Sequence, residues 1–175
     1  MKILGISGSL RKDSLNTAAL RAAQQLVPAG STLEIFSLAE IPIYNEDVRG
    51  NGHPAPVQKL RDAIKAAEAV VIACPEYNYS FSGVLKNAID WASRPPEQPF
   101  DGKKIALLGA SPGMLGTSRA QYHLRQVFIF MNGKILNKPE VFIAAADKKF
   151  DDKGNLTDEK TREVIGKMLA ALVNS

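Results

Sequence analysis

The sequence contains few of the residues that bind metals or form disulfides. Of its 175 residues, one is cysteine and two are histidine. The single cysteine, Cys74, excludes an internal disulfide framework, a cysteine-based zinc site and an iron–sulfur cluster. The sequence also offers no catalytic triad, no pair of acids for general acid–base chemistry and no metal-ligand spacing. If the chain is an enzyme, a bound cofactor has to supply the chemistry.

Long apolar runs and clusters of basic residues are absent as well. No apolar run approaches the roughly 20 residues that span a bilayer, and the first apolar run is too short for a signal peptide. The 22 basic and 18 acidic residues give a formal charge of +4 without a run of lysine and arginine. Such a charge favours anionic ligands, for example phosphorylated cofactors. We therefore expect a cytoplasmic protein that binds neither membranes nor nucleic acids.

Short apolar runs alternate with amphipathic segments along the chain. The segments carry apolar residues at spacings of three and four, which is typical of helices that bury one face. Ser14 and Thr157 are the expected caps of the first and last helices, and residues 147–160 are expected to form an exposed turn. The apolar runs predict five strands, over residues 2–7, 32–36, 69–73, 104–109 and 141–144.

This alternation predicts the fold class. Right-handed crossovers place helices on both faces of a parallel sheet. Five strands in this length favour the flavodoxin-like order 2-1-3-4-5 in one three-layer α/β domain covering residues 1–175. Ligands of such a sheet bind at the carboxyl ends of the strands. The loops that leave those ends span residues 8–14, 75–83 and 111–117.

The first of these loops has the residues of a phosphate site. It reads GSLRKDS and opens a helix, where free backbone N–H groups and the helix dipole favour an anion. Hydroxyl and amide donors surround it, and Arg11 adds a guanidinium fork. In the simpler alternative, Ser14 only caps the helix and Arg11 is solvated, which leaves the other donors unexplained. The loop lacks the motifs of dinucleotide and Walker sites, so the phosphate of a mononucleotide fits best.

The second and third loops have groups that suit a planar ring. Pro75 restricts the second loop, while Tyr77 and Tyr79 offer flat faces and Asn78 offers a donor and an acceptor. The third loop, ASPGMLG, has small residues that let the backbone approach a ligand closely. The alternatives are a polar turn with two surface tyrosines and an ordinary flexible loop. The three loops share one edge of the predicted sheet, and this favours a common site.

Several isolated residues receive structural interpretations. Cys74 is expected to be a buried apolar filler, because no basic residue beside it in the sequence would stabilise a thiolate. His53 and His123 are expected to be structural or exposed. Lys86 and Asp90 are expected to form a local surface pair, since they lie four residues apart on one helix.

The chain resembles the NADPH-dependent FMN reductase family, which includes bacterial quinone, chromate and azo-dye reductases. The resemblance rests on GSLR at residues 8–11 with Ser14 and Asn16, on PEYNYS at 75–80 and on GVLKNAIDW at 83–91, and it covers nearly the whole chain. It implies non-covalent FMN that takes hydride from NADPH or NADH. The flavin would then reduce quinones or similar small acceptors (azo dyes, chromate, free flavin) in a ping-pong reaction. Ser82 stands where the family usually has proline, and we expect this to loosen the loop near the ring.

The resemblance also implies roles for individual residues, none of them a catalytic acid or base. Those implied to hold the FMN phosphate are Ser9, Arg11, Ser14, Asn16 and Thr17. Those implied to face the flavin ring are Glu76, Tyr77 and Asn78, with Ser111 and Gly113 on its other rim. The remaining predicted cofactor contacts in these loops are Leu10, Pro75 and Tyr79.

Related proteins form dimers or tetramers, so the resemblance implies a homodimer or a homotetramer. The sequence supports this, because the segment 118–131 is apolar over most of a helical circumference and such helices are buried on several sides. Arg119, Tyr122 and Glu140 are the interface candidates. The alternative functions are a flavodoxin-type FMN electron carrier without NAD(P)H oxidase activity and a flavin-free binding protein. Electron carriers of this type are usually strongly acidic, whereas this chain carries +4.

Overall fold

The structure is a computed structural model that describes residues 1–50 and 52–175. A six-stranded sheet lies at its centre, with strand order β2-β1-β3-β6-β7 and with β8 paired to β6. Every pairing in this sheet is parallel. The strands are β1 (Lys2–Ser7), β2 (Thr32–Phe36), β3 (Ala69–Ala73), β6 (Lys104–Ala110), β7 (Lys134–Ile135) and β8 (Val141–Ile143).

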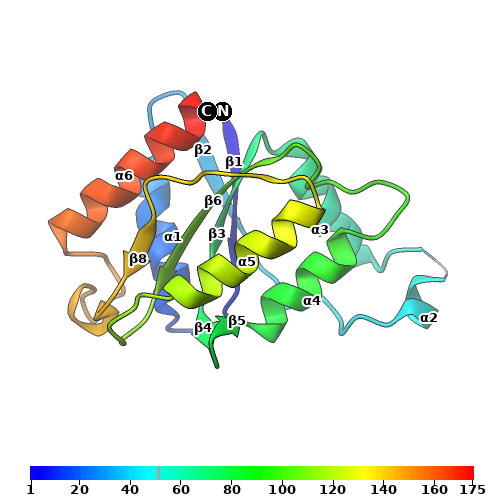
Figure 1. Cartoon of the computed structure of the whole chain (residues 1–175), viewed down its shortest axis with the longest axis horizontal. Helices are drawn as coiled ribbons and strands as arrows, with labels where there is room; N and C mark the ends of the chain where they lie inside the picture. Colours follow the sequence, from blue (N-terminus) through cyan, green and yellow to red (C-terminus); the bar gives the residue numbers. More distant parts are fainter. Residues whose placement is uncertain (51) are drawn as a thin grey trace.

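Helices cover both faces of the sheet (Figure 1). One face packs against α1 and α6 around buried residues such as Leu20, Val71 and Met168. The other packs against α3, α4 and α5 around residues such as Ile64 and Phe128. The helices are α1 (Leu15–Leu26), α2 (Glu46–Arg49), α3 (Ala55–Ala66), α4 (Gly83–Ala92), α5 (Ser118–Phe130) and α6 (Glu159–Asn174), with a short 3-10 helix over Ala146–Lys148.

The predicted flavodoxin-like α/β sandwich is confirmed, with one refinement at the sheet edge. The fifth position is shared by two short strands that both pair with β6. β7 pairs with its first residues, Lys104 and Ile105, and β8 pairs with its last three, Leu108 to Ala110. The sequence predicted one strand here because Lys134 and Ile135 are too short a run to carry a periodic signal.

Two local predictions near the C-terminus are wrong. Asp158, and not Thr157, caps α6: its carboxylate accepts a hydrogen bond from the Thr161 N–H at 2.9 Å. The segment 147–160 is more than an exposed turn, because Leu156 is buried and forms an antiparallel bridge with Phe150. Lone apolar residues in polar surroundings give no periodic signal that would have indicated this burial.

No helix within residues 1–50 and 52–175 has the length and apolar character needed to cross a membrane. The same residues contain no group of three or more histidine, cysteine, aspartate or glutamate side chains arranged to hold a metal ion.

Candidate active site

The loops after β1, β3 and β6 meet at one edge of the sheet, the lower edge in Figure 1. Backbone hydrogen bonds hold their starting points together. The Gly8 N–H donates to the Ala73 carbonyl at 2.9 Å, and the Cys74 N–H donates to the Leu108 carbonyl at 2.8 Å. The predicted convergence of the three loops is thus present in the structure.

The first loop presents a helix N-terminus with a nearby guanidinium. Ser14 caps α1, as expected, by accepting a hydrogen bond from the Thr17 N–H at 3.2 Å. Arg11 is exposed, and its guanidinium donates one hydrogen bond, at 3.3 Å, to the Asp13 carbonyl. A guanidinium has five N–H donors, so most of those of Arg11 can turn toward an anion beside the loop.

Asn16 is placed differently from its neighbours in the loop. Its side chain is buried, donates to the Ala110 carbonyl at 3.0 Å and accepts from the Ala110 N–H at 2.9 Å. This pair of bonds ties the start of α1 to the end of β6, directly before Ser111. The main contact of the Asn16 amide is therefore with the protein itself. One of its N–H groups remains for a phosphate.

Ser82 strengthens the site where we expected it to loosen the loop. Its hydroxyl donates to the Gly8 carbonyl at 2.6 Å and accepts from the Leu85 N–H at 3.2 Å. The same side chain therefore caps α4 and pins the first loop. The expectation was wrong because it considered the absent proline ring and not the two hydrogen bonds that a serine can make.

The second loop is a tight hairpin that the sequence analysis did not predict. Strands β4 (Glu76–Tyr77) and β5 (Ser80–Phe81) pair in antiparallel register. Asn78 and Tyr79 connect them with φ angles of 50° and 68°, which is the backbone of a type I′ turn. A left-handed conformation is uncommon for tyrosine and is maintained by its surroundings.

Helix α5 provides those surroundings. The Glu76 carboxylate accepts from the Ala120 N–H at 3.1 Å and so satisfies the helix N-terminus, which has no cap of its own. The Arg119 guanidinium lies 3.9 Å from the centre of the Tyr79 ring. His123, which is exposed, shares a 2.8 Å hydrogen bond with the Ser80 hydroxyl. The hairpin is therefore attached to a rigid element.

The third loop is anchored to the edge strand β8. The Ser111 N–H donates to the Ile143 carbonyl at 3.0 Å, and the Ser111 hydroxyl accepts from the Gly113 N–H at 3.0 Å. Gly116 lies so close to Phe142 and Ile143 that a side chain there would clash with their backbone. These contacts fix the position of the loop opposite the hairpin.

A cavity of about 170 Å³ lies between the three loops. The first loop contributes hydroxyl and guanidinium donors to its wall, and the second loop contributes a proline and a tyrosine. This donor set fits a mononucleotide, with a phosphate near α1 and a flat ring near the hairpin. The predicted residues that line it are Ser9, Arg11, Ser14, Asn16, Pro75, Glu76, Tyr77 and Ser111.

The remaining cofactor candidates lie beside this cavity. Asn78, Tyr79 and Gly113 line a neighbouring cavity of about 410 Å³ that shares Glu76 and Ser111 with the first. Leu10 and Thr17 line a third cavity, of about 200 Å³, on the β2 side of the first loop. Thr17 is occupied there by a 2.8 Å hydrogen bond between its hydroxyl and that of Ser7. Of the five predicted phosphate residues, Thr17 is therefore the one that does not line the first cavity, and the phosphate contacts themselves stay a prediction.

The expectations for isolated residues are confirmed. Cys74 is fully buried, and burial, with the Glu76 charge adding, raises the pKa of its thiol to about 12. Lys86 and Asp90 form an exposed pair at 2.8 Å. His53 packs edge-on against Trp91, and burial lowers the pKa of its imidazole, with the Arg61 charge adding.

The interface candidates lie on or near the exposed side of α5. Tyr122 and Glu140 lie close together, and the hydrogen bond between their side chains raises the pKa of the Tyr122 phenol. Arg119 points instead toward Glu76, with 3.8 Å between guanidinium and carboxylate. Ile129 and Phe130, two apolar residues of the same helix, are exposed in the single chain. Their role in assembly stays a prediction.

The model of the NADPH-dependent FMN reductase family matches residues 1–148. The chain belongs to this family. A relative from Pseudomonas aeruginosa, named NAD(P)H-dependent FMN reductase, is 58% identical over 172 residues, which are 98% of this chain and 93% of the relative. A quinone reductase of Escherichia coli K12 is 40% identical over 98% of this chain and 93% of its own.

A solved structure agrees with these relatives. The flavoenzyme NAD(P)H:(acceptor) oxidoreductase FerB from Paracoccus denitrificans superposes with a TM-score of 0.89 and 34% identity, over 99% of this chain and 95% of its own. The chain is accordingly an FMN-dependent NAD(P)H oxidoreductase, which confirms the predicted function class. A small-molecule acceptor fits this activity.

Proposed function

We propose that FMN binds non-covalently in the cavity between the three loops. Its phosphate would lie at the first loop and its ring between the hairpin and the third loop. The observation that supports this is the lining of the cavity, to which the first loop contributes Ser9, Arg11 and Ser14 and the second loop contributes Pro75 and Tyr77. A phosphate and an isoalloxazine ring need these two environments in one continuous site.

Each group of residues would have a separate task in binding. The Arg11 fork and the N-terminus of α1 would neutralise the phosphate. Tyr77 and Pro75 would restrict the ring, and Ser111 would offer hydrogen-bonding groups from the opposite side. Asn16 and Ser82 would act indirectly, by fixing Ala110 and Gly8. The contributions of these residues are binding and orientation.

We further propose that the protein reduces quinones or similar small acceptors, such as azo dyes, chromate or free flavin, in a ping-pong reaction. When bound, FMN supplies hydride chemistry that no amino-acid side chain can perform. The larger cavity shares Glu76 and Ser111 with the cofactor cavity, so nicotinamide and acceptor could occupy it in turn.

Steady-state kinetics tests this proposal against its main rival. The purified protein, loaded with FMN, is mixed with NADPH or NADH, with and without a quinone, and absorbance at 340 nm is followed. A reductase oxidises the nicotinamide much faster when the quinone is present, with parallel lines in double-reciprocal plots. A flavodoxin-type electron carrier would show no NAD(P)H oxidation under either condition, and that result would contradict the proposal.

Replacement of Arg11 tests the position of the phosphate. Loss of a charge-assisted hydrogen bond costs about 1.5–3 kcal/mol, so Arg11→Ala should weaken FMN binding by about 10- to 150-fold. The matched control is Lys12→Ala, an equal charge change on an exposed neighbour, which should weaken binding far less. Dissociation constants come from the quenching of FMN fluorescence. Equal effects of both variants would mean that the phosphate responds only to the net charge of the loop and makes no hydrogen bond with Arg11.

Two further expectations stay predictions. We propose a homodimer or homotetramer in which Arg119, Tyr122 and Glu140 lie near the subunit contact. We also propose that the chain is one domain that acts in the cytoplasm, without membrane or nucleic-acid partners. Analytical ultracentrifugation of the FMN-loaded protein checks the assembly, since a purely monomeric protein at micromolar concentration would contradict it.

A further inference from the structure

We infer that Ser7 is a positioning residue of the phosphate loop, which spans residues 8–14. Its hydroxyl ties the end of β1 to the first turn of α1 through the hydroxyl of Thr17, and this Ser7–Thr17 contact holds the loop in the shape that accepts a phosphate. The inference rests on the proposed function and deepens it. It names a determinant of the preference for FMN over riboflavin, the same flavin without its phosphate.

Ser7 provides a fixed point beside this loop. It is the last residue of β1, a strand that lies between β2 and β3 in the sheet, and it pairs with Ala73 of β3. The residue is only 6% exposed. Since buried hydroxyl groups are hydrogen-bonded, the partners of the Ser7 hydroxyl are part of the folded structure.

The Ser7 hydroxyl contacts both ends of the loop. It shares a 2.8 Å hydrogen bond with the Thr17 hydroxyl in the first turn of α1, and it accepts from the Ser9 N–H at 3.3 Å. One hydroxyl can make both bonds, because it has one donor and two acceptor positions. The strand, the start of the loop and the helix are thus joined at the Ser7 Oγ.

The middle of the loop is exposed and is shaped by short-range hydrogen bonds. Residues 10–13 are all exposed. The Arg11 N–H donates to the Ser9 hydroxyl at 3.4 Å, and the Ser14 N–H donates to the Arg11 carbonyl at 3.2 Å. The backbone of Arg11 is therefore held between Ser9 and Ser14, and Ser7 holds the Ser9 end.

The Ser7–Thr17 contact acts on a ligand only through the loop. Neither residue lines the cofactor cavity, and both line the cavity of about 200 Å³ on the β2 side. The walls proposed for the ring have separate anchors, since the hairpin is attached to α5 and the third loop to β8. A loop that is ordered before binding avoids the entropy cost of becoming ordered on binding. This benefit goes to the phosphate and not to the ring.

The alternative is the role that the family resemblance implies for Thr17, which is a direct contact with the phosphate. The two roles predict different results. A direct ligand contributes to binding whether or not Ser7 is present. The two partners of one hydrogen bond, in contrast, are coupled, so that removing the second after the first costs no further affinity.

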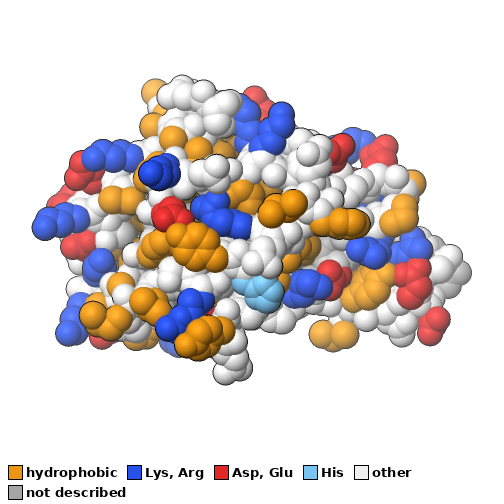
Figure 2. Space-filling view, viewed as in Figure 1, with side chains coloured by type: hydrophobic (Ala, Val, Ile, Leu, Met, Phe, Trp, Pro, Cys, Tyr) orange, Lys and Arg blue, Asp and Glu red, His pale blue; other side chains and the backbone are white. Residues whose placement is uncertain are grey.

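The experiment measures dissociation constants of FMN and of riboflavin by fluorescence, on the full chain freed of FMN. The variants are Ser7→Ala, Thr17→Val and the double variant. Inorganic phosphate, added as a competitor of FMN, reports on the phosphate site alone. None of these variants changes the charge, so the basic side chains along the lower edge of the molecule, seen in Figure 2, are the same throughout.

Thr161→Val is the matched control for loss of a threonine hydroxyl. Thr161 is the third residue of α6, as Thr17 is of α1, and its hydroxyl is hydrogen-bonded to Asp158. It lines none of the cavities that include residues of the first loop. Thr161→Val should therefore lower the midpoint of urea denaturation and leave FMN affinity unchanged. Thr17→Ser keeps the hydroxyl and should bind FMN like the unmodified protein.

Ser7→Ala and Thr17→Val should each weaken FMN binding by about 3- to 10-fold, which corresponds to one neutral hydrogen bond. The double variant should lose no more than either single variant, and competition by inorganic phosphate should weaken by the same factor. Riboflavin affinity should change by less than about 2-fold, because the ring shares no partner with the Ser7–Thr17 contact. A purely structural role would instead weaken FMN and riboflavin alike.

The inference would be overturned if Thr17→Val alone lost FMN affinity, since Thr17 would then be a direct ligand. Equal losses for FMN and riboflavin, unchanged competition by inorganic phosphate, or no loss in any variant would overturn it as well. If Ser7→Ala does not fold, Ser7→Cys takes its place, because a thiol forms weaker hydrogen bonds. Failure of the proposed function is distinguishable: the unmodified protein would not bind FMN, or Arg11→Ala would bind it unchanged.

Discussion

Asn16 supports the site by a contact with the protein backbone that differs from the phosphate contact predicted for it. The sequence placed it with the phosphate donors, whereas the structure joins both of its amide atoms to the Ala110 backbone. Ala110 precedes Ser111 of the third loop, so Asn16 connects the phosphate loop to the ring side of the cavity. Local sequence patterns cannot predict this contact, because Asn16 and Ala110 are 94 residues apart.

Replacement of Asn16 separates these two roles. Asn16→Ala leaves the Ala110 N–H and carbonyl unpaired in the interior, at about 1–3 kcal/mol for each group. The free energy of unfolding of the FMN-free protein should therefore fall by about 2–6 kcal/mol, measured by urea denaturation. Gln25→Ala, on the exposed side of α1, should change it by less than about 0.5 kcal/mol. Unchanged stability with weakened FMN binding would show that Asn16 is a phosphate ligand instead.

Cys74 provides a second prediction at this scale. Burial raises the pKa of its thiol to about 12, so the folded protein keeps the thiol protonated at pH 8, where thiolate reagents are normally used. An aromatic disulfide reagent should react with less than about a tenth of the protein before unfolding and with one equivalent after it. Because the pKa is raised, this group's contribution to stability is complete below about pH 8.5 and is lost as the pH rises toward 12. Rapid reaction of the native protein would contradict the assigned burial.

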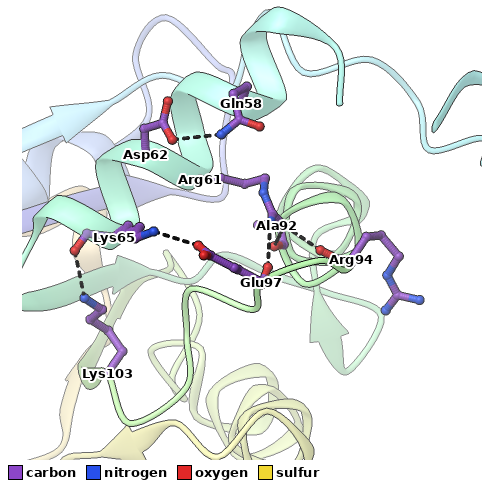
Figure 3. A network of polar contacts seen from close by, with 8 residues as sticks. All are labelled: Gln58, Arg61, Asp62, Lys65, Ala92, Arg94, Glu97 and Lys103. Atoms are coloured by element: carbon purple, nitrogen blue, oxygen red, sulfur yellow. Dashed lines mark hydrogen bonds and ion pairs between the residues drawn. The ribbon is translucent and has the colours of Figure 1, made fainter. Parts of the chain in front are cut away.

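Among the structural elements, α3 and α4 are joined by an arginine that the cofactor site does not use. Arg61 is buried, and its guanidinium donates to the carbonyls of Ala92, the last residue of α4, and of Arg94 and Glu97 beyond it (Figure 3). An exposed pair between Lys65 and Glu97, at 2.7 Å, lies alongside. The buried arginine thus satisfies the last carbonyl of α4, that of Ala92, and two carbonyls of the segment that follows it.

Arg61 and Lys65 make a matched pair of tests for this element. Arg61→Met deprives three carbonyls of their donors and should lower the free energy of unfolding by about 3 kcal/mol or more. Lys65→Met removes an exposed ion pair and should cost less than about 1 kcal/mol. Urea denaturation measures both. If the two variants lost equal stability, the buried guanidinium would not hold the end of α4.

The hairpin β4–β5 is the missed element that matters most for the site; the sequence reasoning also missed the short elements α2 and β7. Two-residue hairpins are usually recognised by Asn-Gly or Asp-Gly, and here the turn is Asn78-Tyr79. Its left-handed tyrosine is stabilised by Arg119 and its strand by Glu76, both through α5. The helices and long strands were predictable because each has its own periodic pattern. The hairpin depends on a helix about 40 residues further along the chain.

For the whole molecule, the fold was predictable and the details of the site were partly so. Alternating apolar runs set the strand order, and the order brought the three loops to one edge. Eight of the thirteen predicted cofactor residues line one cavity, because residues in the same loop stay close together. The division of the others between two neighbouring cavities depends on which way each side chain turns, and no local pattern carries that information.

The central claim is that these loops hold a flavin that NAD(P)H reduces. An anaerobic titration with NADPH, followed by visible absorption, tests it most directly on the protein purified in the presence of FMN and then freed of excess. We predict about one FMN per chain and full bleaching of the 450 nm band by one equivalent of NADPH, with the colour restored by a quinone. Bound FMN that NADPH does not bleach, or no bound FMN at all, would contradict the account.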